Sequence, residues 1–326
     1  MSAAAILVTG GAGYIGGVTA ERLIQRGEPV VVLDNLSRGY RDVVPPGARF
    51  VQGDIGERKV VRSIFRQNAI RAVMHFAAFA LVGESVEKPE LYYRNNVMGS
   101  LTLIDAAREA GVERFILSST CAVYGDKNPM PLREDMPRAP INPYGESKLV
   151  VERALEWLHR AHGWTYFALR YFNACGASAE RGERHDPETH LIPNVLMAAT
   201  GETAGVRVLG DDYPTPDGTC IRDYIHVEDL ADAHILALEA PAAAAGAYNV
   251  ATGRGYSVRE VIDAARRITG RPIPETSAPR RPGDPPELIA DASKIQQAFG
   301  WRARHDLDSV IQTAWAFKLK QAAVRS

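Results

Sequence analysis

Over its first half, the chain alternates short apolar runs with longer segments in which apolar residues recur at helical spacing. Six runs rich in Val, Ile, Leu and Phe predict buried parallel strands, because such strands are covered on both faces. They are Ala4–Thr9, Val30–Asp34, Arg49–Asp54, Ala72–Phe76, Arg114–Ser118 and Tyr166–Arg170. The intervening segments predict helices at Gly17–Arg26, Arg58–Asn68, Pro89–Ala110 and Tyr144–Arg160. Strands and helices in turn indicate βαβ units, and hence an α/β fold with a doubly wound parallel sheet.

The composition is that of an ordinary globular protein. Of its 326 residues, 46% are hydrophobic and 24% charged, and 38 basic against 39 acidic side chains leave a net charge of -1. Nucleic-acid binding depends on clustered Lys and Arg, and the sequence has no basic block, so we expect no nucleic-acid partner. No apolar run reaches the roughly 18 residues of a membrane span, so no membrane partner is expected either. Cys121, Cys175 and Cys220 are dispersed without metal-ligand spacing, which favours reduced thiols in a cytoplasmic protein.

Three glycines mark the turn between the first predicted strand and the first predicted helix. Gly10, Gly13 and Gly16 allow a tight turn, close backbone approach to a pyrophosphate and close packing of helix on strand. Asp34 ends the second predicted strand, where a carboxylate accepts both ribose hydroxyls and repels a 2′-phosphate. In the alternative, the glycines only turn a corner and Asp34 only caps a loop. We predict a Rossmann domain that prefers NAD to NADP, with the pair Asp54-Ile55 either touching the adenine or capping a helix.

After Tyr171 the alternation gives way to connections rich in Pro and Gly, with shorter predicted helices near Asp229–Glu239, Val258–Thr269 and Leu307–Lys320. This change of pattern predicts a second, smaller α/β domain that binds the substrate. We place the NAD-binding Rossmann domain at residues 1–172 and the substrate-binding domain mainly at residues 173–326. About residues 222–250 are expected to return to the Rossmann domain.

A Tyr and a Lys, Tyr144 and Lys148, lie four positions apart in a predicted helix. This spacing puts both side chains on one helix face. A Lys ammonium beside the phenol favours the phenolate and lowers the pKa of the Tyr from about 10, which makes it a general base. In the alternative interpretation, Lys148 is an exposed side chain paired with Glu152, but this leaves Tyr144 without a role.

Hydroxyl side chains follow the fifth predicted strand, in the run Ser118-Ser119-Thr120. Ligands of open α/β sheets bind at the carboxyl edge of the strands, so Thr120 or Ser119 would lie beside the nicotinamide. A polar strand end that caps a turn is the structural alternative. The glycine turn, the Tyr/Lys pair and this hydroxyl occur in an order that brings all three to one edge of one sheet.

The histidines predict no metal centre. His159 and His162 share a helix face, and His185 and His190 flank a loop. No carboxylate or Cys is expected to complete a ligand set around either pair. We therefore expect solvated imidazoles and no bound metal.

Motifs spread over nearly the whole chain point to a known family. They include the glycine turn and the runs His75-Phe76-Ala77-Ala78, Asn142-Pro143-Tyr144-Gly145-Glu146-Ser147-Lys148, Arg170-Tyr171-Phe172-Asn173, Arg222-Asp223-Tyr224-Ile225-His226-Val227 and Asp291-Ala292-Ser293-Lys294. With these runs the sequence resembles the extended short-chain dehydrogenase/reductases and, among them, the UDP-glucose (UDP-galactose) 4-epimerases. The run that begins at Arg222 and the Asn after Tyr171-Phe172 are typical of nucleotide-sugar members.

The resemblance implies NAD-dependent interconversion of UDP-glucose and UDP-galactose by transient oxidation at sugar C4, rotation of the 4-keto sugar and return of the hydride. It makes Tyr144 the base for the 4-hydroxyl proton, with Lys148 lowering its pKa and holding the nicotinamide ribose, and Thr120 bonded to the same oxygen. It also implies a homodimer with a UDP-hexose as its ligand. The implied cofactor contacts are Gly10, Gly13, Tyr14, Ile15, Gly16, Asp34, Asn35, Asp54, Ile55, Phe76, Ala77, Asn95, Ser118, Tyr144, Lys148 and Tyr171. The implied substrate contacts are Thr120, Tyr144, Asn173, His190, Leu191, Arg222, Arg281, Asp284 and Leu288.

Three positions depart from the family pattern. Ala80 stands where many members carry a Lys that reaches the cofactor, which implies one charged contact fewer with NAD. His190 stands at a position often held by Asn, and Leu209 at one often held by an aromatic that lies over the uracil. The departures weaken the implied nucleobase contacts more than the implied catalysis.

A fourth position bears on the substrate range. Leu288 matches the family residue beside sugar C2, whose bulk decides whether an N-acetyl group fits. The intermediate size of Leu implies that UDP-glucose and UDP-galactose are the main pair, with weaker activity on the N-acetylated UDP-hexoses. A one-residue slip in the proline-rich run before it would put Glu287 or Ile289 there instead.

Two rival activities differ at specific residues. Nucleotide-sugar dehydratases and decarboxylases of the same superfamily place acids directly after the hydroxyl residue of the strand end, whereas here Cys121 and Ala122 follow Thr120. Non-catalytic NAD-binding sensors commonly lose the Tyr or the Lys, and this chain keeps Tyr144 and Lys148. Another nucleotide-sugar epimerase of the superfamily is the nearest alternative.

Overall fold

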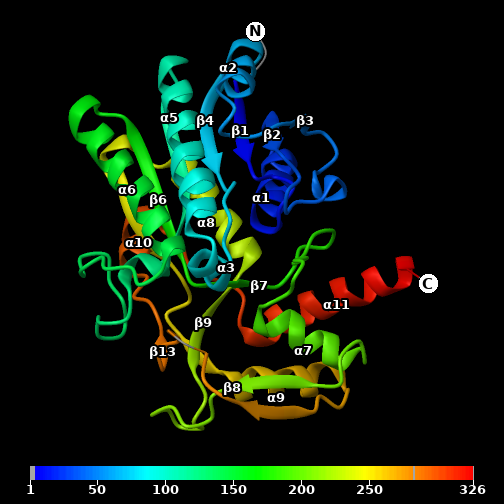
Figure 1. Ribbon diagram of the computed structural model, residues 1–326. Coiled ribbons are helices and arrows are strands. Elements are labelled where there is room, and N and C mark those ends of the chain that lie inside the picture. The colour runs from blue at the N-terminus through cyan, green and yellow to red at the C-terminus, as the bar shows by residue number, and fades with distance from the viewer. Residues whose placement is uncertain (1–3, 282, 326) are drawn as a thin grey trace.

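A seven-stranded parallel sheet forms the larger part of the protein, in the upper half of the view in Figure 1. The structure is a computed structural model that describes residues 4–281 and 283–325. The strands are β1 (Ala5–Thr9), β2 (Val30–Asp34), β3 (Arg49–Gln52), β4 (Ile70–His75), β5 (Arg114–Thr120), β6 (Thr165–Tyr171) and β10 (Gly246–Val250). Their order is β10-β6-β5-β4-β1-β2-β3, with every neighbouring pair parallel. The six predicted strands are all present, and the predicted doubly wound Rossmann sheet is confirmed.

Helices cover both faces of this sheet. Apolar residues of α1 (Tyr14–Gln25) and α8 (Val227–Glu239) pack on one face, together with α10 (Ser293–Phe299). On the other face, α2 (Arg58–Gln67), α5 (Ser100–Glu109) and α6 (Pro143–His162) bury the second core cluster. The strand order reverses between β1 and β4, so the crevice at their carboxyl ends is where such folds bind ligands.

The predicted single helix Pro89–Ala110 is wrong in its middle. The structure has α4 (Pro89–Tyr92), then a π-helical segment at Tyr93–Gly99, then α5, with a separate α3 (Val82–Glu87) before them. The Asn96 side chain in the π-helical segment bonds the backbone N–H and C=O of Phe79. A wide turn of this kind is frequent at functional sites, and here it ties the segment to the loop after β4.

The smaller part contains short elements that the sequence pattern did not predict. β7 (Asn173–Cys175), β9 (Ile221–His226), β11 (Gly255–Ser257) and β13 (Glu287–Leu288) form one sheet around β9, and β8 (Val206–Leu209) pairs with β12 (Glu275–Ala278). A third core cluster lies among α7 (Leu191–Ala199), α9 (Val258–Thr269) and α11 (Leu307–Arg325). Between β9 and β11 the chain returns to the large sheet through α8 and β10, so the two parts are joined by several crossings.

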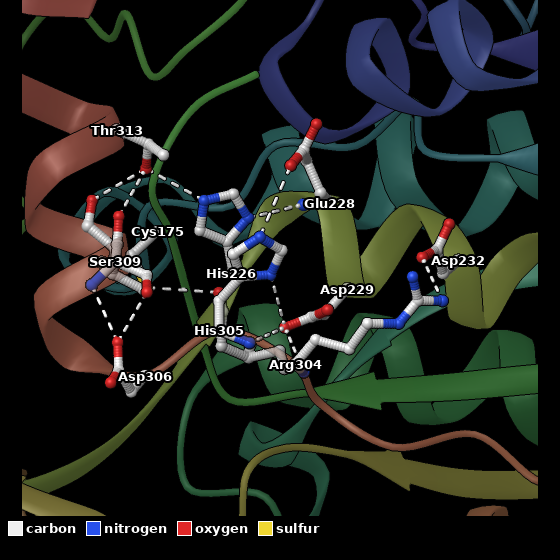
Figure 2. A network of polar contacts seen from close by, with 12 residues as sticks. Cys175, His226, Glu228, Asp229, Asp232, Arg304, His305, Asp306, Ser309 and Thr313 are labelled. Carbon is white, nitrogen blue, oxygen red and sulfur yellow. Dashed lines mark hydrogen bonds and ion pairs between the residues drawn. The ribbon is translucent and has the colours of Figure 1, made fainter. Parts of the chain in front are cut away.

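A polar network fastens α11 to the end of β9 and the start of α8. Figure 2 shows the His226 and His305 imidazoles face to face, with ring centroids 3.9 Å apart. Nε2 of His226 lies 2.9 Å from the Thr313 hydroxyl on α11. Asp229 accepts hydrogen bonds from the backbone N–H groups of Arg304 and His305, each at 3.1 Å. The network therefore fixes how the C-terminal helix meets the large sheet.

Burial of His226 makes this junction sensitive to acid. Burial, with a contribution from the charge of His305, lowers the pKa of His226 from 6.5 to about 3. As the pH falls below 6.5, His226 binds a proton in the unfolded chain but stays neutral in the folded protein. Stability is therefore lost progressively down to pH 3.

We expect His226→Gln to flatten the pH dependence of stability. From pH 7 to pH 5.5 the wild type should lose about 1 kcal/mol more unfolding free energy than the variant, because one His with an ordinary unfolded pKa no longer titrates. Urea unfolding at both pH values measures this difference. His162→Gln, which removes an exposed imidazole on α6, is the matched control. Equal losses in wild type and His226→Gln would contradict the assignment.

Candidate active site

The turn between β1 and α1 is a cradle that only glycine can form. Gly10 has φ 74°, and a Cβ built on it would lie 2.5 Å from the backbone N of Ala77. A Cβ on Gly16 would lie 2.4 Å from the carbonyl O of Gly10. Gly13 is the N-cap of α1 and offers no side chain to the first backbone N–H groups of the helix. The cradle thus fits a pyrophosphate, which these N–H groups and the helix dipole would hold.

The carboxylate of Asp34 lies beside the same turn. It is 8% exposed and accepts hydrogen bonds from the backbone N–H of Ala12 at 3.0 Å and of Leu36 at 2.8 Å. Burial raises the pKa of Asp34 above its ordinary value, and the two N–H groups oppose the rise. A ribose diol is a suitable partner for such a carboxylate.

Of the neighbouring residues implied as adenosine contacts, Asn35 donates to Asp54 at 2.7 Å. Asp54 also accepts from the backbone N–H of Gly56 at 2.7 Å, and Ile55 is buried. Asp54 thus closes the loop after β3, while the N-cap of α2 is Glu57. Asp54 is therefore not the N-cap residue of α2, and its local contacts are those of a loop turn.

The three residues implied as catalytic, Thr120, Tyr144 and Lys148, lie at the carboxyl end of β5. The Asn142 side chain caps α6 by accepting from the Gly145 N–H at 2.8 Å, and this starts the helix one residue before Tyr144. Thr120 is the last residue of β5 and is buried. Lys148, also buried, donates to the Ser118 carbonyl at 2.8 Å, which fastens the helix to the strand end.

The pKa of Tyr144 corrects one expectation. Burial raises the pKa of Tyr144 to about 12, and a hydrogen bond with the Thr120 hydroxyl opposes the rise. The predicted lowering of this pKa by Lys148 is therefore wrong in this structure, because burial dominates and the ammonium is turned to the Ser118 carbonyl. Burial also lowers the pKa of Lys148 to about 8, opposed by Glu152.

A buried ion pair holds α6 against β6, and sequence reasoning missed it. Arg170 of β6 donates to both carboxylate oxygens of Glu152, at 3.1 and 2.7 Å, and the two side chains are 1% and 2% exposed. Ser119 of β5 donates to the same carboxylate, and Arg170 donates to the Tyr124 hydroxyl at 2.8 Å. Glu152 is thus the partner of Arg170 rather than of an exposed Lys148. The available signal was an Arg at the end of an otherwise apolar strand.

The loop after β4 meets α6 through the π-helical segment. Asn96 donates to Ser147 at 3.1 Å, and Asn95, an implied cofactor contact, donates to Asn96 at 2.8 Å. Asn96 was not singled out from the sequence. Phe76, at the end of β4, packs on the His234 ring at 4.6 Å between centroids.

Tyr171, another implied cofactor contact, is hydrogen-bonded to His234 through its hydroxyl. Tyr14, the first residue of α1, donates to the Gly176 carbonyl at 2.6 Å. Ile15 packs against the core beside the same turn. The structure therefore brings the implied cofactor contacts to one edge of the large sheet.

Two arginines implied as substrate contacts converge on one carboxylate. Arg281 bonds both oxygens of Asp284, at 3.0 and 2.9 Å, and Arg222 of β9 lies 3.6 Å from the same group. Asn173, the first residue of β7, donates to the Asp223 carbonyl at 3.0 Å. Leu288 of β13 is opposite Arg222 in the register of the small sheet. Guanidinium groups gathered in this way suit a diphosphate.

His190 and Leu191 start α7, with His190 as its N-cap residue. The expectation that no carboxylate accompanies His185 and His190 is wrong. Nδ1 of His190 lies 2.9 Å from a carboxylate oxygen of Glu183 and 2.9 Å from one of Glu188. Burial opposes charging these imidazoles, yet the two carboxylates raise the pKa values of both His190 and His185. Glu183 and Glu188 stand two or three positions from these histidines, and this close spacing was the signal that the sequence interpretation did not use.

The sequence and the fold both match known epimerases. The model of the "NAD dependent epimerase/dehydratase family" matches residues 6–251. The UDP-glucose 4-epimerase of Lacticaseibacillus casei is 47% identical over 315 residues, which is 95% of this chain and 95% of that protein. The one of Streptomyces lividans is 50% identical over 314 residues, 95% of this chain and 94% of that one.

Solved structures agree with this match. A UDP-glucose 4-epimerase from Brucella ovis in complex with NAD has a TM-score of 0.92 at 49% identity, covering 96% of this chain and 98% of that one. One from Bifidobacterium longum in complex with NAD+ and UDP has a TM-score of 0.92 at 39% identity, covering 98% and 99%. The glycine cradle and the Asp34 carboxylate fit the cofactor of that family. The chain belongs to the NAD dependent epimerase/dehydratase family and, within it, to the UDP-glucose 4-epimerases.

Proposed function

We propose that this protein interconverts UDP-glucose and UDP-galactose by inverting sugar C4, with NAD as its resident cofactor. The observation that carries the proposal is the meeting of Tyr144, Thr120 and Lys148 at the sheet edge that also holds the glycine cradle. The cradle and Asp34 would hold NAD, which when bound supplies a reversible hydride acceptor for C4. The identity with named UDP-glucose 4-epimerases over nearly the whole chain supports the same substrate pair.

Tyr144 acts as the base of the reaction. Its phenolate takes the proton of the 4-hydroxyl as that carbon is oxidised, and the resulting phenol gives the proton back when the opposite face is reduced. Thr120 bonds the phenol and is placed to bond the same sugar oxygen. Desolvation of the Tyr144 phenol sets the high pKa that cofactor and substrate must overcome.

Lys148 serves as a fixed positive charge near this base. Its ammonium is anchored on the Ser118 carbonyl, one helical turn after Tyr144. The same geometry leaves its other donors for the ribose of the nicotinamide half. With this anchor the ammonium does not lower the pKa of Tyr144 in the structure, so the role proposed for Lys148 is to hold the cofactor's ribose and the end of β5.

On the substrate side, Arg222 and Arg281 would bind the diphosphate. They would either leave Asp284 or keep contact with it while the diphosphate is bound. Holding the nucleotide by its diphosphate leaves the hexose free to turn, which inversion requires. Asn173, His190 and Leu191 complete the implied nucleotide contacts.

Loss of water from the sugar is disfavoured by the residue after Thr120. Burial raises the pKa of the Cys121 thiol to about 12, opposed mainly by the charge of Arg222. A group of this kind cannot serve as the acid and base that a dehydratase needs, and Ala122 has no titratable group. Epimerisation is therefore favoured over dehydration.

We expect Tyr144→Phe to lower turnover of UDP-galactose by at least about a hundredfold, the usual scale of a lost acid–base group. NAD content and thermal unfolding should be unchanged, because the ring and its packing remain. A coupled assay for UDP-glucose measures the turnover. Tyr93→Phe, on the exposed face of the π-helical segment, is the matched control. Retention of more than about a tenth of wild-type turnover in Tyr144→Phe would refute the assignment.

We further propose that Leu288 limits the substrate range. It lies opposite Arg222 and packs on the buried cluster that contains Val123, Tyr124 and Phe172, next to the catalytic strand end. Its apolar branched end offers no partner for an acetamide N–H, whose unpaired burial costs about 1–3 kcal/mol. We therefore assign UDP-glucose and UDP-galactose as the main pair and N-acetylated UDP-hexoses as weaker substrates.

Leu288→Tyr should reduce kcat/KM for UDP-N-acetylgalactosamine relative to UDP-galactose, because the larger ring fills the space of the acetamide. Leu288→Ser should move the ratio in the opposite direction, since it opens space and adds a hydrogen-bonding group. Parallel kcat/KM measurements for both sugars in the three proteins give the ratio. An unchanged ratio in Leu288→Tyr would show that another residue, such as the neighbouring Glu287 or Ile289, lies at this position.

A homodimer is the assembly that the surface favours. Large apolar side chains are exposed on α3, the π-helical segment, α5 and α6, where single-chain packing leaves them uncovered. They are Val86 at 62%, Tyr93 at 41%, Met98 at 63%, Leu101 at 37% and Trp157 at 66%. Exposed apolar groups concentrated on neighbouring helices suit helix packing between two copies.

We expect Met98→Glu combined with Trp157→Glu to convert the dimer into monomer. Two carboxylates in an apolar interface cost more than the contacts that they replace. Light scattering after size exclusion measures the mass of each protein. Leu319→Glu, at another exposed apolar residue far from these helices on α11, should remain dimeric. A monomeric wild type, or a double variant that stays dimeric, would disprove the interface.

The compartment follows from the thiols. Cys121, Cys175 and Cys220 are free, and Cys175 and Cys220 are buried. We place such a protein in the reducing cytoplasm. Within the described residues, no helix is long and apolar enough to cross a membrane.

A further inference from the structure

Two carboxylates and two imidazoles converge in the loop before α7. Glu183, His185, Glu188 and His190 each contribute one ligand atom, and these atoms all lie within 4.8 Å of one another. Nδ1 of His190 is 2.9 Å from an oxygen of Glu183 and 2.9 Å from one of Glu188. Nδ1 of His185 is 3.1 Å from Glu183 and 3.6 Å from Glu188.

These spacings are close to those between the ligands of one small cation. A Zn²⁺ ion binds His nitrogen and carboxylate oxygen at about 2.0–2.2 Å, almost always tetrahedrally in structural sites. Two ligands of a regular tetrahedron are then about 3.3–3.5 Å apart, from the same bond lengths. The four observed nitrogen–oxygen spacings lie between 2.9 and 3.6 Å, near that value, although Glu188 faces His185 with Oε2 and His190 with Oε1, so only one of its two oxygens would be the ligand.

The two carboxylates of the cluster also make it a suitable site for a cation. The Glu183 and Glu188 side chains are only 8% and 11% exposed. Within residues 4–281 and 283–325, their ion-pair partners are these two imidazoles and no Lys or Arg. Nδ1 of His185 is buried and has no aligned hydrogen-bond partner, although it lies close to both carboxylates. A divalent cation would bind that nitrogen and both carboxylates at once, in place of the protons that the two imidazoles carry when they are charged.

The nature of the ligands selects the class of cation. Imidazole nitrogens suit Zn²⁺ and its transition-metal neighbours, whereas Mg²⁺ and Ca²⁺ prefer sets made only of oxygen. The imidazole of His190 is 47% exposed and that of His185 32%, so the cluster is open to solvent on one side and an ion can enter.

We propose that Glu183, His185, Glu188 and His190 form a binding site for one divalent transition-metal cation, best suited to Zn²⁺. The site shares His190 with the implied nucleotide contacts, but metal binding is measured without substrate, so its test is separate from that of the proposed epimerase activity. It lies between the two halves of the protein: the Tyr14 ring of α1 packs edge-on to His185 at 6.4 Å, and His190 is the N-cap of α7. A bound ion would thus stabilise the loop that lies between α1, which follows the glycine turn, and α7, the first helix of the smaller part.

Co²⁺ is the probe for geometry, because four-coordinate Co²⁺ absorbs visible light far more strongly than six-coordinate Co²⁺. Untagged protein stripped with a chelator is titrated with Co²⁺ and then, in competition with a chromogenic chelator, with Zn²⁺. We expect a strong visible band that saturates at one Co²⁺ per chain and is abolished by Zn²⁺. We also expect Zn²⁺ to raise the unfolding temperature of the wild type.

The double variant His185→Gln/His190→Gln should weaken Zn²⁺ binding at least about a hundredfold and lose both the Co²⁺ band and the thermal shift. His159→Gln/His162→Gln, which removes two imidazoles from α6, is the matched control and should bind as the wild type does. Circular dichroism of the metal-free proteins checks that each is folded.

A third variant, His305→Gln, tests the other group that could hold an ion, which consists of His226, Glu228 and His305. Binding that is lost in His305→Gln but kept in His185→Gln/His190→Gln would overturn the proposal. So would a wild type that gives no strong Co²⁺ band, or a band that the double variant retains.

Discussion

The buried ion pair between Glu152 and Arg170 is the constraint on which the active site depends. Taking two charges out of water costs several kcal/mol per ion, so such a pair persists only when further hydrogen bonds satisfy it. Here Ser119 donates to the carboxylate, and the Tyr124 hydroxyl accepts from the guanidinium and donates to Asn249 at 2.7 Å. These contacts join α6, β5, β6 and β10, so the catalytic helix has one position on the sheet.

That position explains how the chemistry is assembled. Glu152 lies one helical turn after Lys148 and two turns after Tyr144, so all three share the face of α6 that meets the strand ends. The ion pair fixes the position of α6 along β6. The bond from Lys148 to the Ser118 carbonyl fixes α6 against the end of β5, where Thr120 lies. Tyr144 and Thr120, the proposed base and its hydroxyl partner, are thus positioned by the Glu152–Arg170 pair and by the bond from Lys148 to Ser118.

The sequence predicted those parts of the fold that have a period or a fixed spacing. Continuous apolar runs predicted the strands of the large sheet, and the glycine turn and the Tyr144/Lys148 spacing predicted the edge where they meet. β13 has two residues and β7 three, too few to show any period, and the π-helical segment is invisible because its apolar spacing continues that of a helix. The sequence pattern could not predict contacts between residues that only the fold brings together, such as the pair of Glu152 on α6 with Arg170 on β6. Burial likewise decides the pKa of Tyr144, and the degree of burial follows from packing in the folded protein rather than from a local sequence pattern.

The account requires that Tyr144 handles only the hydroxyl proton, while the hydrogen on C4 leaves and returns without meeting water. UDP-galactose labelled with deuterium on C4 tests this directly when the holoenzyme converts it in ordinary water and the product is read by mass spectrometry and proton NMR. The account predicts UDP-glucose that keeps its deuterium at C4. Product in which solvent hydrogen has replaced the label would show that the carbon itself is deprotonated, and would contradict it.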